Sequence, residues 1–192
     1  MNKVDRSELL DLGAYEQIRP HFRQRIIEAK RNRRIELGGH MSFVFENHDT
    51  MLLQIQEMLR TERITKEAAI LHELTTYNEL VPEPGTLSAT HFIEYDEPQE
   101  RTRMLAAFAS LRDKVHLQLG DARATARFTI QFGEEMDRIP AVNYLTFDVG
   151  ADAASVLRDE TASCSLVVTH ADYAHEVALP EALRRELAED LD

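Results

Sequence analysis

Eight histidines are spread along the chain, and their tightest group is His170-x-Asp172-x-x-His175. Imidazole nitrogens and carboxylate oxygens are ligands for zinc and other divalent metals. A β-hairpin turn over these residues would bring both imidazoles to one side, with Asp172 as a third ligand. The same Asp172 could instead stabilise the turn, with both histidines outside any site. A metal site and an ordinary turn therefore remain as alternatives.

Other catalytic chemistry has little support in the sequence. The chain contains no glycine-rich phosphate loop, no G-x-S-x-G turn and no H-E-x-x-H helix. Cys164 is the single cysteine, and at the start of a predicted strand it is expected to be a small core residue. One thiol cannot build an iron–sulfur or zinc cluster. The sequence predicts no cofactor apart from the metal alternative at His170 and a second, weaker metal candidate at His48-Asp49 beside Glu46.

Positive charge is concentrated in residues 19–34, which contain seven Lys and Arg residues and one acid, Glu28. Four of these cations line one flank of a predicted amphipathic helix: Arg19, Arg23, Lys30 and Arg34. The apolar stripe beside them consists of Tyr15, Ile18, Phe22, Ile26 and Ala29, and Arg33 falls inside it. Guanidinium groups suit carboxylates and phosphates, so this flank is a candidate groove for an anion or an acidic partner. Alternatively, the cations cover core edges and pair with acids of later segments.

A second predicted helix, at 48–63, carries polar residues at the border of its apolar arc. Asn47 or Asp49 suits the N-cap position of this helix. Gln56 and Arg60 lie at the border, where a buried polar side chain costs about 1–3 kcal/mol unless it finds a partner. We therefore expect Gln56 and Arg60 to join a buried polar network. Such a network either fixes the packing or lines a ligand pocket.

The overall composition excludes several classes of protein. The chain has 192 residues, a net charge of −12 and 43% hydrophobic residues, which is typical of a globular protein. The negative charge disfavours nucleic-acid binding, and no apolar run is long enough to cross a membrane. A single cysteine and the lack of an apolar leader in the first residues predict a cytoplasmic protein.

Turn residues divide the chain into two predicted regions, 1–84 and 85–192. The first holds the two helices above, a hairpin around Gly38-Gly39 and a third helix at 65–80. The segment Pro82-Glu83-Pro84-Gly85 is the clearest break in the chain, so we place the boundary there.

The second region contains a weak internal repeat. Residues 91–96 and 143–148 share one pattern, and each is followed by a predicted helix and two strands. These patterns predict an α+β fold: an N-terminal helical lobe with a β-hairpin, then two β-α-β-β units forming a mostly antiparallel sheet. We expect both regions to pack as one globular unit.

Three sequence blocks occur in order, IRP at 18–20, FEN-x-DT at 45–50 and QIQEMLR-x-ER at 54–63. With them the chain resembles the bacterial domain-of-unknown-function family 3501 over most of its length. Genes of that family tend to lie beside those of rubrerythrin-like and iron–sulfur proteins, which implies a redox context. The resemblance brings no catalytic residues. Its motif positions in this chain are Arg19, Pro20, Arg23, Asn47, Asp49, Gln56, Glu57, Arg60 and Glu62.

Two functional hypotheses follow from these observations. In the first, the chain is a non-enzymatic accessory protein whose basic helix binds an acidic iron–sulfur or rubrerythrin-like redox protein, or a small anion. In the second, it is an enzyme or a metal-binding protein with a pocket between the helical lobe and the sheet, near Gln56, Arg60, Glu62 and His72. The ligand and the oligomeric state stay open.

Overall fold

The computed structural model describes residues 2–129 and 137–192. The helices are α1 (Leu12–Arg33), α2 (His48–Thr61), α3 (Glu67–Asn78), α4 (Pro98–Ala107), α5 (Ala153–Arg158) and α6 (Glu181–Asp190), with 3₁₀ turns η1 (Arg6–Glu8) and η2 (Phe108–Asp113). The strands are β1 (Arg34–Leu37), β2 (Met41–Glu46), β3 (Thr86–Ile93), β4 (Val115–Leu119), β5 (Ala122–Phe128), β6 (Val142–Asp148), β7 (Cys164–His170) and β8 (Tyr173–Ala178). This arrangement confirms the predicted α+β class.

The eight strands form one antiparallel sheet in the order β1-β2-β3-β6-β5-β4-β7-β8. The two predicted β-α-β-β units are β3-α4-β4-β5 and β6-α5-β7-β8. Their strands interleave in the sheet, because β6 of the second unit inserts between β3 and β5 of the first. The two units therefore do not form separate halves of the sheet.

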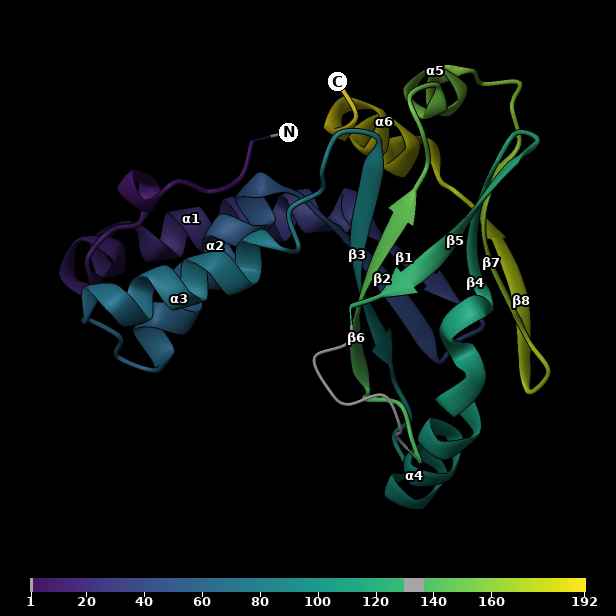
Figure 1. The fold of residues 1–192 in the computed structure, drawn as a ribbon, viewed down its shortest axis with the longest axis horizontal. Coiled ribbons are helices and arrows are strands. Elements are labelled where there is room, and N and C mark those ends of the chain that lie inside the picture. The colour runs from purple at the N-terminus through teal and green to yellow at the C-terminus, as the bar shows by residue number, and fades with distance from the viewer. Residues whose placement is uncertain (1, 130–136) are drawn as a thin grey trace.

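The helices α1, α2 and α3 lie side by side and project from one side of the sheet (Figure 1). Local sequence explains their ends. The Asp11 side chain caps α1 by accepting from Ala14 N, and Asn47 with Thr50 forms a capping box at the start of α2. Pro20 lies inside α1, which continues past it to Arg33.

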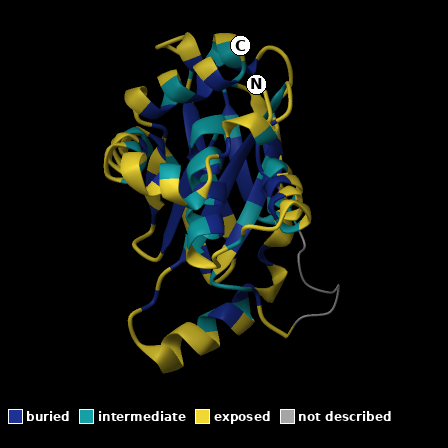
Figure 2. Ribbon diagram, turned by 90° about the vertical axis from the view of Figure 1, so that its left-hand side faces the viewer, coloured by how far each residue is buried: buried dark blue, intermediate teal, exposed yellow. Residues whose placement is uncertain are grey.

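The main core fills the concave side of the curved sheet. Inward-facing strand residues such as Phe43, Phe45 and Phe147 pack there with Phe108 of η2 and Leu187 of α6. A second apolar cluster lies between α2, α3 and the segment that precedes α1. Figure 2 shows the buried residues concentrated on the strands and the exposed residues on the outer helices.

Tyr173 joins the two edge strands of the sheet. Its hydroxyl donates to the carbonyl oxygen of Leu37 at 2.5 Å and accepts from the backbone N of His40 at 2.9 Å. Gly38, with φ +65°, allows this approach, because a Cβ there would lie 2.6 Å from the Tyr173 oxygen. The sheet is thereby closed into a barrel-like shell at the turn between β1 and β2.

The predicted boundary at residue 84 lies just before β3. The hairpin of β1 and β2 belongs to the common sheet, since β2 pairs with β3 from Met41↔Ile93 to Glu46↔Ser88. The division into 1–84 and 85–192 stays a prediction. Among the described residues, no helix is both long enough and apolar enough to span a bilayer.

Candidate partner-binding surface

The inner face of α1 packs against α2, and it carries two of the predicted stripe residues at its centre. Tyr15 and Ile26 are buried, as the periodicity predicts, whereas Ile18 is 45% exposed. The prediction failed at Ile18 because α2 covers only part of the arc that the apolar residues occupy. The cations beside the stripe therefore differ in burial and in partner. Arg19 and Arg23 contact α2, and Lys30 contacts the sheet.

Arg19 and Arg23 share one acid, Glu57 of α2. Arg19 donates from Nε to Glu57 Oε1 at 2.7 Å and from Nη2 to Oε2 at 2.9 Å, and the Tyr15 hydroxyl donates to Oε1 at 2.6 Å. These donors, with Arg19 the strongest, lower the pKa of Glu57 to about 2. Burial, together with the neighbouring carboxylate, raises the pKa of Tyr15. Arg23 lies farther away, with Nε 3.7 Å from Oε2.

Lys30 faces the seam between α1 and the sheet. Its ammonium lies 3.7 Å from Glu46 Oε2, and Glu46 is 4% exposed. The other carboxylate oxygen of Glu46 accepts from the Thr90 hydroxyl at 2.6 Å. Oε2 of Glu46 accepts no hydrogen bond from any described residue. A buried carboxylate oxygen is thus balanced only by a nearby lysine charge.

Three further predicted residues, Arg34, Asn47 and Asp49, bind other side chains or the backbone of the chain. Arg34 donates from Nη2 to Ser42 Oγ at 2.8 Å and to Glu94 at 3.1 Å. Asp49 pairs with Arg25 at 2.9 Å, and Asn47 accepts from Thr50 N at 3.0 Å at the start of α2.

Gln56, Arg60 and Glu62 have separate surroundings in the structure. Gln56 is 2% exposed, and its amide binds the backbone of Leu10. Arg60 pairs with Glu16 of α1, and Glu62 is the exposed C-cap residue of α2. The expected buried position is confirmed for Gln56, and Arg60 instead lies at the partly exposed edge of the α1–α2 packing.

Arg33 has the strongest buried contact in α1. It is 1% exposed and donates from Nη1 and Nη2 to the Asp190 carboxylate of α6 at 2.5–2.6 Å. Glu186 lies 3.4 Å from its Nε. Burial raises the pKa of Asp190 to about 6, against the opposing effect of Arg33. Its place inside the apolar stripe signalled the burial of Arg33, but the partner lies 157 residues away in the chain.

The two predicted histidine ligands have other partners in the structure. His170 is buried, with Nε2 3.0 Å from Ser110 Oγ, and its Nδ1 accepts from the backbone N of Asp172 at 3.2 Å. His175 is exposed and packs edge-on against Tyr173. Within 2–129 and 137–192, no three His, Cys, Asp or Glu side chains are placed to hold a metal ion.

A shallow cavity of about 400 Å³ lies between the end of α5 and the start of α6. Its arginines have partners in the chain. Arg184 donates to the carbonyl oxygens of Leu157 at 3.0 Å and Ala162 at 3.1 Å, and Arg185 pairs with Glu181 at 2.8 Å. We therefore assign no ligand to this cavity.

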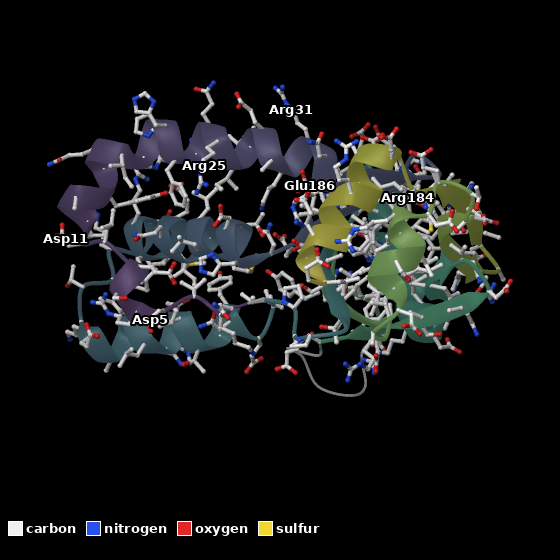
Figure 3. The ribbon with its side chains drawn as sticks, turned by 90° about the horizontal axis from the view of Figure 1, so that it is seen from above. Asp5, Asp11, Arg25, Arg31, Arg184 and Glu186 are labelled. Atoms are coloured by element: carbon white, nitrogen blue, oxygen red, sulfur yellow. The ribbon has the colours of Figure 1, made fainter. Side chains whose placement is uncertain are left out.

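The outer flank of α1 carries an exposed row that we call the cationic ridge: Arg23, Ile27 and Arg31. At 100° per residue these three fall within about 80° of the helix circumference. Ile27 is 47% exposed, and the side chain of Arg23 is 44% exposed. Arg34 is the first residue of β1 and lies outside this row. Arg31 points away from the molecule, whereas Arg25 points toward α2 (Figure 3). The ridge is an apolar side chain with a guanidinium group one helical turn away on either side.

Comparison with known proteins places the chain in a family. The family described as "Protein of unknown function (DUF3501)" matches residues 3–191. The chain belongs to this family. A crystal structure of a novel protein of unknown function from Burkholderia pseudomallei is similar to it, with 31% sequence identity, a TM-score of 0.92 and 100% of each chain covered. No curated protein matches the chain.

Proposed function

We propose that this protein is a non-enzymatic accessory protein that binds an acidic partner protein through the cationic ridge of α1. The observation that carries this proposal is the exposure of Ile27 between Arg23 and Arg31 on α1. Arginine is enriched at protein-binding surfaces, and an apolar side chain between two guanidinium groups suits the centre of such a surface. In a chain with net charge −12, such a surface is a local exception.

Arg23 is suited to exchange its partner. Glu57 already accepts three hydrogen bonds from Tyr15 and Arg19, so it stays paired when Arg23 turns away. The 3.7 Å contact of Arg23 with Glu57 is long and half-exposed, and such ion pairs contribute about 0–1 kcal/mol. A carboxylate of the partner could therefore replace Glu57 at little cost.

The family resemblance suggests the kind of partner, an iron–sulfur or rubrerythrin-like redox protein. Nothing in the ridge requires this chain to hold a cofactor of its own. An acidic surface on such a protein would meet the guanidinium groups, and its apolar centre would cover Ile27. Opposite charges at the rim would speed association and make it sensitive to salt.

The proposal is tested by charge reversal with a matched control. Arg31→Glu should weaken binding of the redox protein encoded by the neighbouring gene about 10-fold, which is about 1.4 kcal/mol. The double variant Arg23→Glu with Arg31→Glu should weaken this binding further. Arg25→Glu changes the charge equally, but Arg25 lies on the other flank and pairs with Asp49. It should change the affinity less than about 2-fold.

Isothermal titration at two salt concentrations measures these affinities, and thermal unfolding shows that each variant is folded. Binding that is unchanged in the double variant would refute the ridge as the docking surface. Equal weakening by Arg25→Glu would show that only the total charge matters.

A second candidate function is small-ligand or metal binding at the seam between α1 and the sheet. The observation in its favour is Glu46 Oε2, which is buried, lies 3.7 Å from Lys30 and accepts no hydrogen bond from the described residues. Elemental analysis of the purified protein tests the metal form. A metal-free protein whose melting temperature does not change when zinc is added would count against it.

A further inference from the structure

The segment before α1 crosses the groove between α2 and α3, and two side-chain amides hold its backbone. Gln56 of α2 accepts from Leu10 N at 2.6 Å and donates to Leu10 O at 3.3 Å. Asn78 of α3 accepts from Val4 N at 2.9 Å and donates to Val4 O at 2.9 Å. We call residues 2–11 the strap. Figure 3 shows the part of the strap with Asp5 between α2 and α3.

Each amide binds the N–H and the C=O of a single residue. An amide side chain has one acceptor and two donors, so it can pair with one residue's main chain as a neighbouring strand would. Main-chain pairing of this kind binds extended peptides whatever their side chains, and apolar pockets then select the sequence. Gln56 and Asn78 are therefore arranged as two clamps for an extended peptide.

The groove also holds specific side chains of the strap. Val4 is 3% and Leu9 6% exposed, and both lie in the apolar cluster of α2 and α3. Between them, Arg6 forms a two-pronged ion pair with Glu67 of α3, at 2.8 and 2.9 Å. The residues of the strap that contact the groove, Val4, Arg6 and Leu9, have the pattern apolar-x-Arg-x-x-apolar.

The backbone of the strap is extended beside both clamps. Asp5, next to Val4, has φ −91° and ψ 150°, and Leu9, next to Leu10, has φ −82° and ψ 122°, with the single turn η1 between them. A capping box of Asp5 and Glu8 stabilises that turn with contacts inside the strap. The shape of the strap therefore depends in part on its own residues.

We propose that the groove between α2 and α3 is a peptide-binding groove and that the strap is its internal, displaceable occupant. The external ligand is an extended segment of a partner protein with the apolar-x-Arg-x-x-apolar pattern. Two acids at the rim of the groove favour cations at two positions of the segment, since Glu67 faces Arg6 and Glu83 lies 3.4 Å from Lys3. This groove is separate from the cationic ridge.

Release of the strap leaves the rest of the helical lobe intact. The helix α1 begins at Leu12, after its cap Asp11, and Tyr15 holds α1 on α2 through Glu57. The outer contacts of the strap are exposed, with side-chain exposures of 38% for Arg6 and 59% for Glu67. Pairs of that exposure are weak, so the strap is held mainly by Val4, Leu9, the two amides and the contact of Glu8 with His48 Nε2 at 3.1 Å.

Exchange of straps between two copies is disfavoured by the same geometry. From Leu10 to Leu12 the chain can span at most about 7 Å, which is too short to reach a second groove while α1 stays packed. A peptide from another protein has no such tether.

The experiment titrates a fluorescently labelled peptide with the sequence of residues 2–12 into the full chain. In the wild type the strap competes at a high effective concentration, so binding should be weak. Val4→Asp, which puts a charge into the apolar pocket, should release the strap and raise the peptide affinity at least about 10-fold. Faster trypsin cleavage at Lys3 and Arg6 reports the release. Circular dichroism reports the fold.

Two further variants test the clamps and the arginine. Asn78→Ala, added to Val4→Asp, should lower the affinity about 10-fold, because one clamp is lost. A peptide with Arg6→Glu should bind more weakly by a smaller factor, about 3-fold, because the Arg6–Glu67 pair is exposed. If Val4→Asp does not fold, Arg6→Glu in the chain provides a milder release. Absence of peptide binding to a variant whose strap is cleaved readily would overturn the proposal. A concentration-dependent dimer that does not bind the peptide would overturn it equally.

Discussion

The buried polar residues divide into those with partners and those without. Gln56 and Asn78 have both amide atoms occupied by backbone groups, and Arg33 has a carboxylate. His91 differs from them. Its ring stacks on Phe43 with centroids 4.5 Å apart, and neither nitrogen has a hydrogen bond with any described residue. Burial of this kind favours the neutral ring.

His91 should make the protein sensitive to acid. Burial lowers the pKa of His91 to about 3 in the folded state, while the unfolded chain protonates near 6.5. The protonation of His91 therefore costs no stability above pH 6.5. Between pH 6.5 and pH 3 it lowers the free energy of unfolding by about 1.4 kcal/mol for each pH unit. Between pH 7 and pH 5 the loss due to His91 should be about 2 kcal/mol.

Urea unfolding of the wild type and of His91→Leu at both pH values measures this loss. Between pH 7 and pH 5 the free energy of unfolding of the variant should fall by about 2 kcal/mol less than that of the wild type. Equal pH dependence of the two proteins would show that His91 is protonated without cost in the fold.

At the scale of elements, the turn between β1 and β2 has two structural roles. It connects a hairpin, and it touches β8 on the opposite edge of the sheet through Tyr173. Gly38 and Gly39 both have positive φ, +65° and +83°, so both are suited to the turn. Only Gly38 lies against β8. A Cβ there would be 2.5 Å from the His175 ring, whereas a Cβ at Gly39 would meet nothing within 4 Å.

The two glycines give a matched test of sheet closure. Both Gly38→Ala and Gly39→Ala should cost about 1 kcal/mol from the positive φ. Gly38→Ala should cost roughly 1–3 kcal/mol more, since Tyr173 and His175 must move. Chemical denaturation measures both costs. Equal costs would indicate that β1 and β8 are not held together at this turn.

At the scale of the whole molecule, few buried polar contacts join the helical lobe to the C-terminal helix. The pair of Arg33 and Asp190 is the most buried of the ion pairs between described residues, with side-chain exposures of 1% and 5%. It connects the end of α1 to α6, and Glu186 of α6 lies 3.4 Å from Arg33 Nε. Figure 3 shows Glu186 where the end of α1 meets α6. Asn47, at the start of α2, also makes a side-chain hydrogen bond to Asp190. Three elements therefore meet at one carboxylate.

Removal of one partner of this pair should be costly, and removal of both should not. Arg33→Met leaves the Asp190 carboxylate buried without its main donor and should cost about 3–5 kcal/mol. Arg33→Met combined with Asp190→Leu should bring stability back to within about 1 kcal/mol of the wild type. A double-mutant cycle in urea measures the coupling energy. Additive costs would mean that the pair does not couple α1 to α6.

The sequence by itself determined the elements and the class of fold. Glycines at 38 and 39, the break at Pro82 and the apolar periods predict the hairpin, the helices and the succession of strands along the chain, but not their order in the sheet. These signals are local, because turn conformation and amphipathic spacing depend on a few neighbouring residues. The burial of Gln56 was predicted from its place beside an apolar arc for the same reason.

Only the tertiary structure decided the partners of the charges. Glu57 pairs with Arg19 across 38 residues, and Asp190 pairs with Arg33 across 157. Tertiary packing also turned most of the predicted basic flank toward acids and left the outer ridge at Ile27 exposed. A periodic pattern gives the direction of a side chain on its own helix, but it contains no information on which distant element will lie opposite.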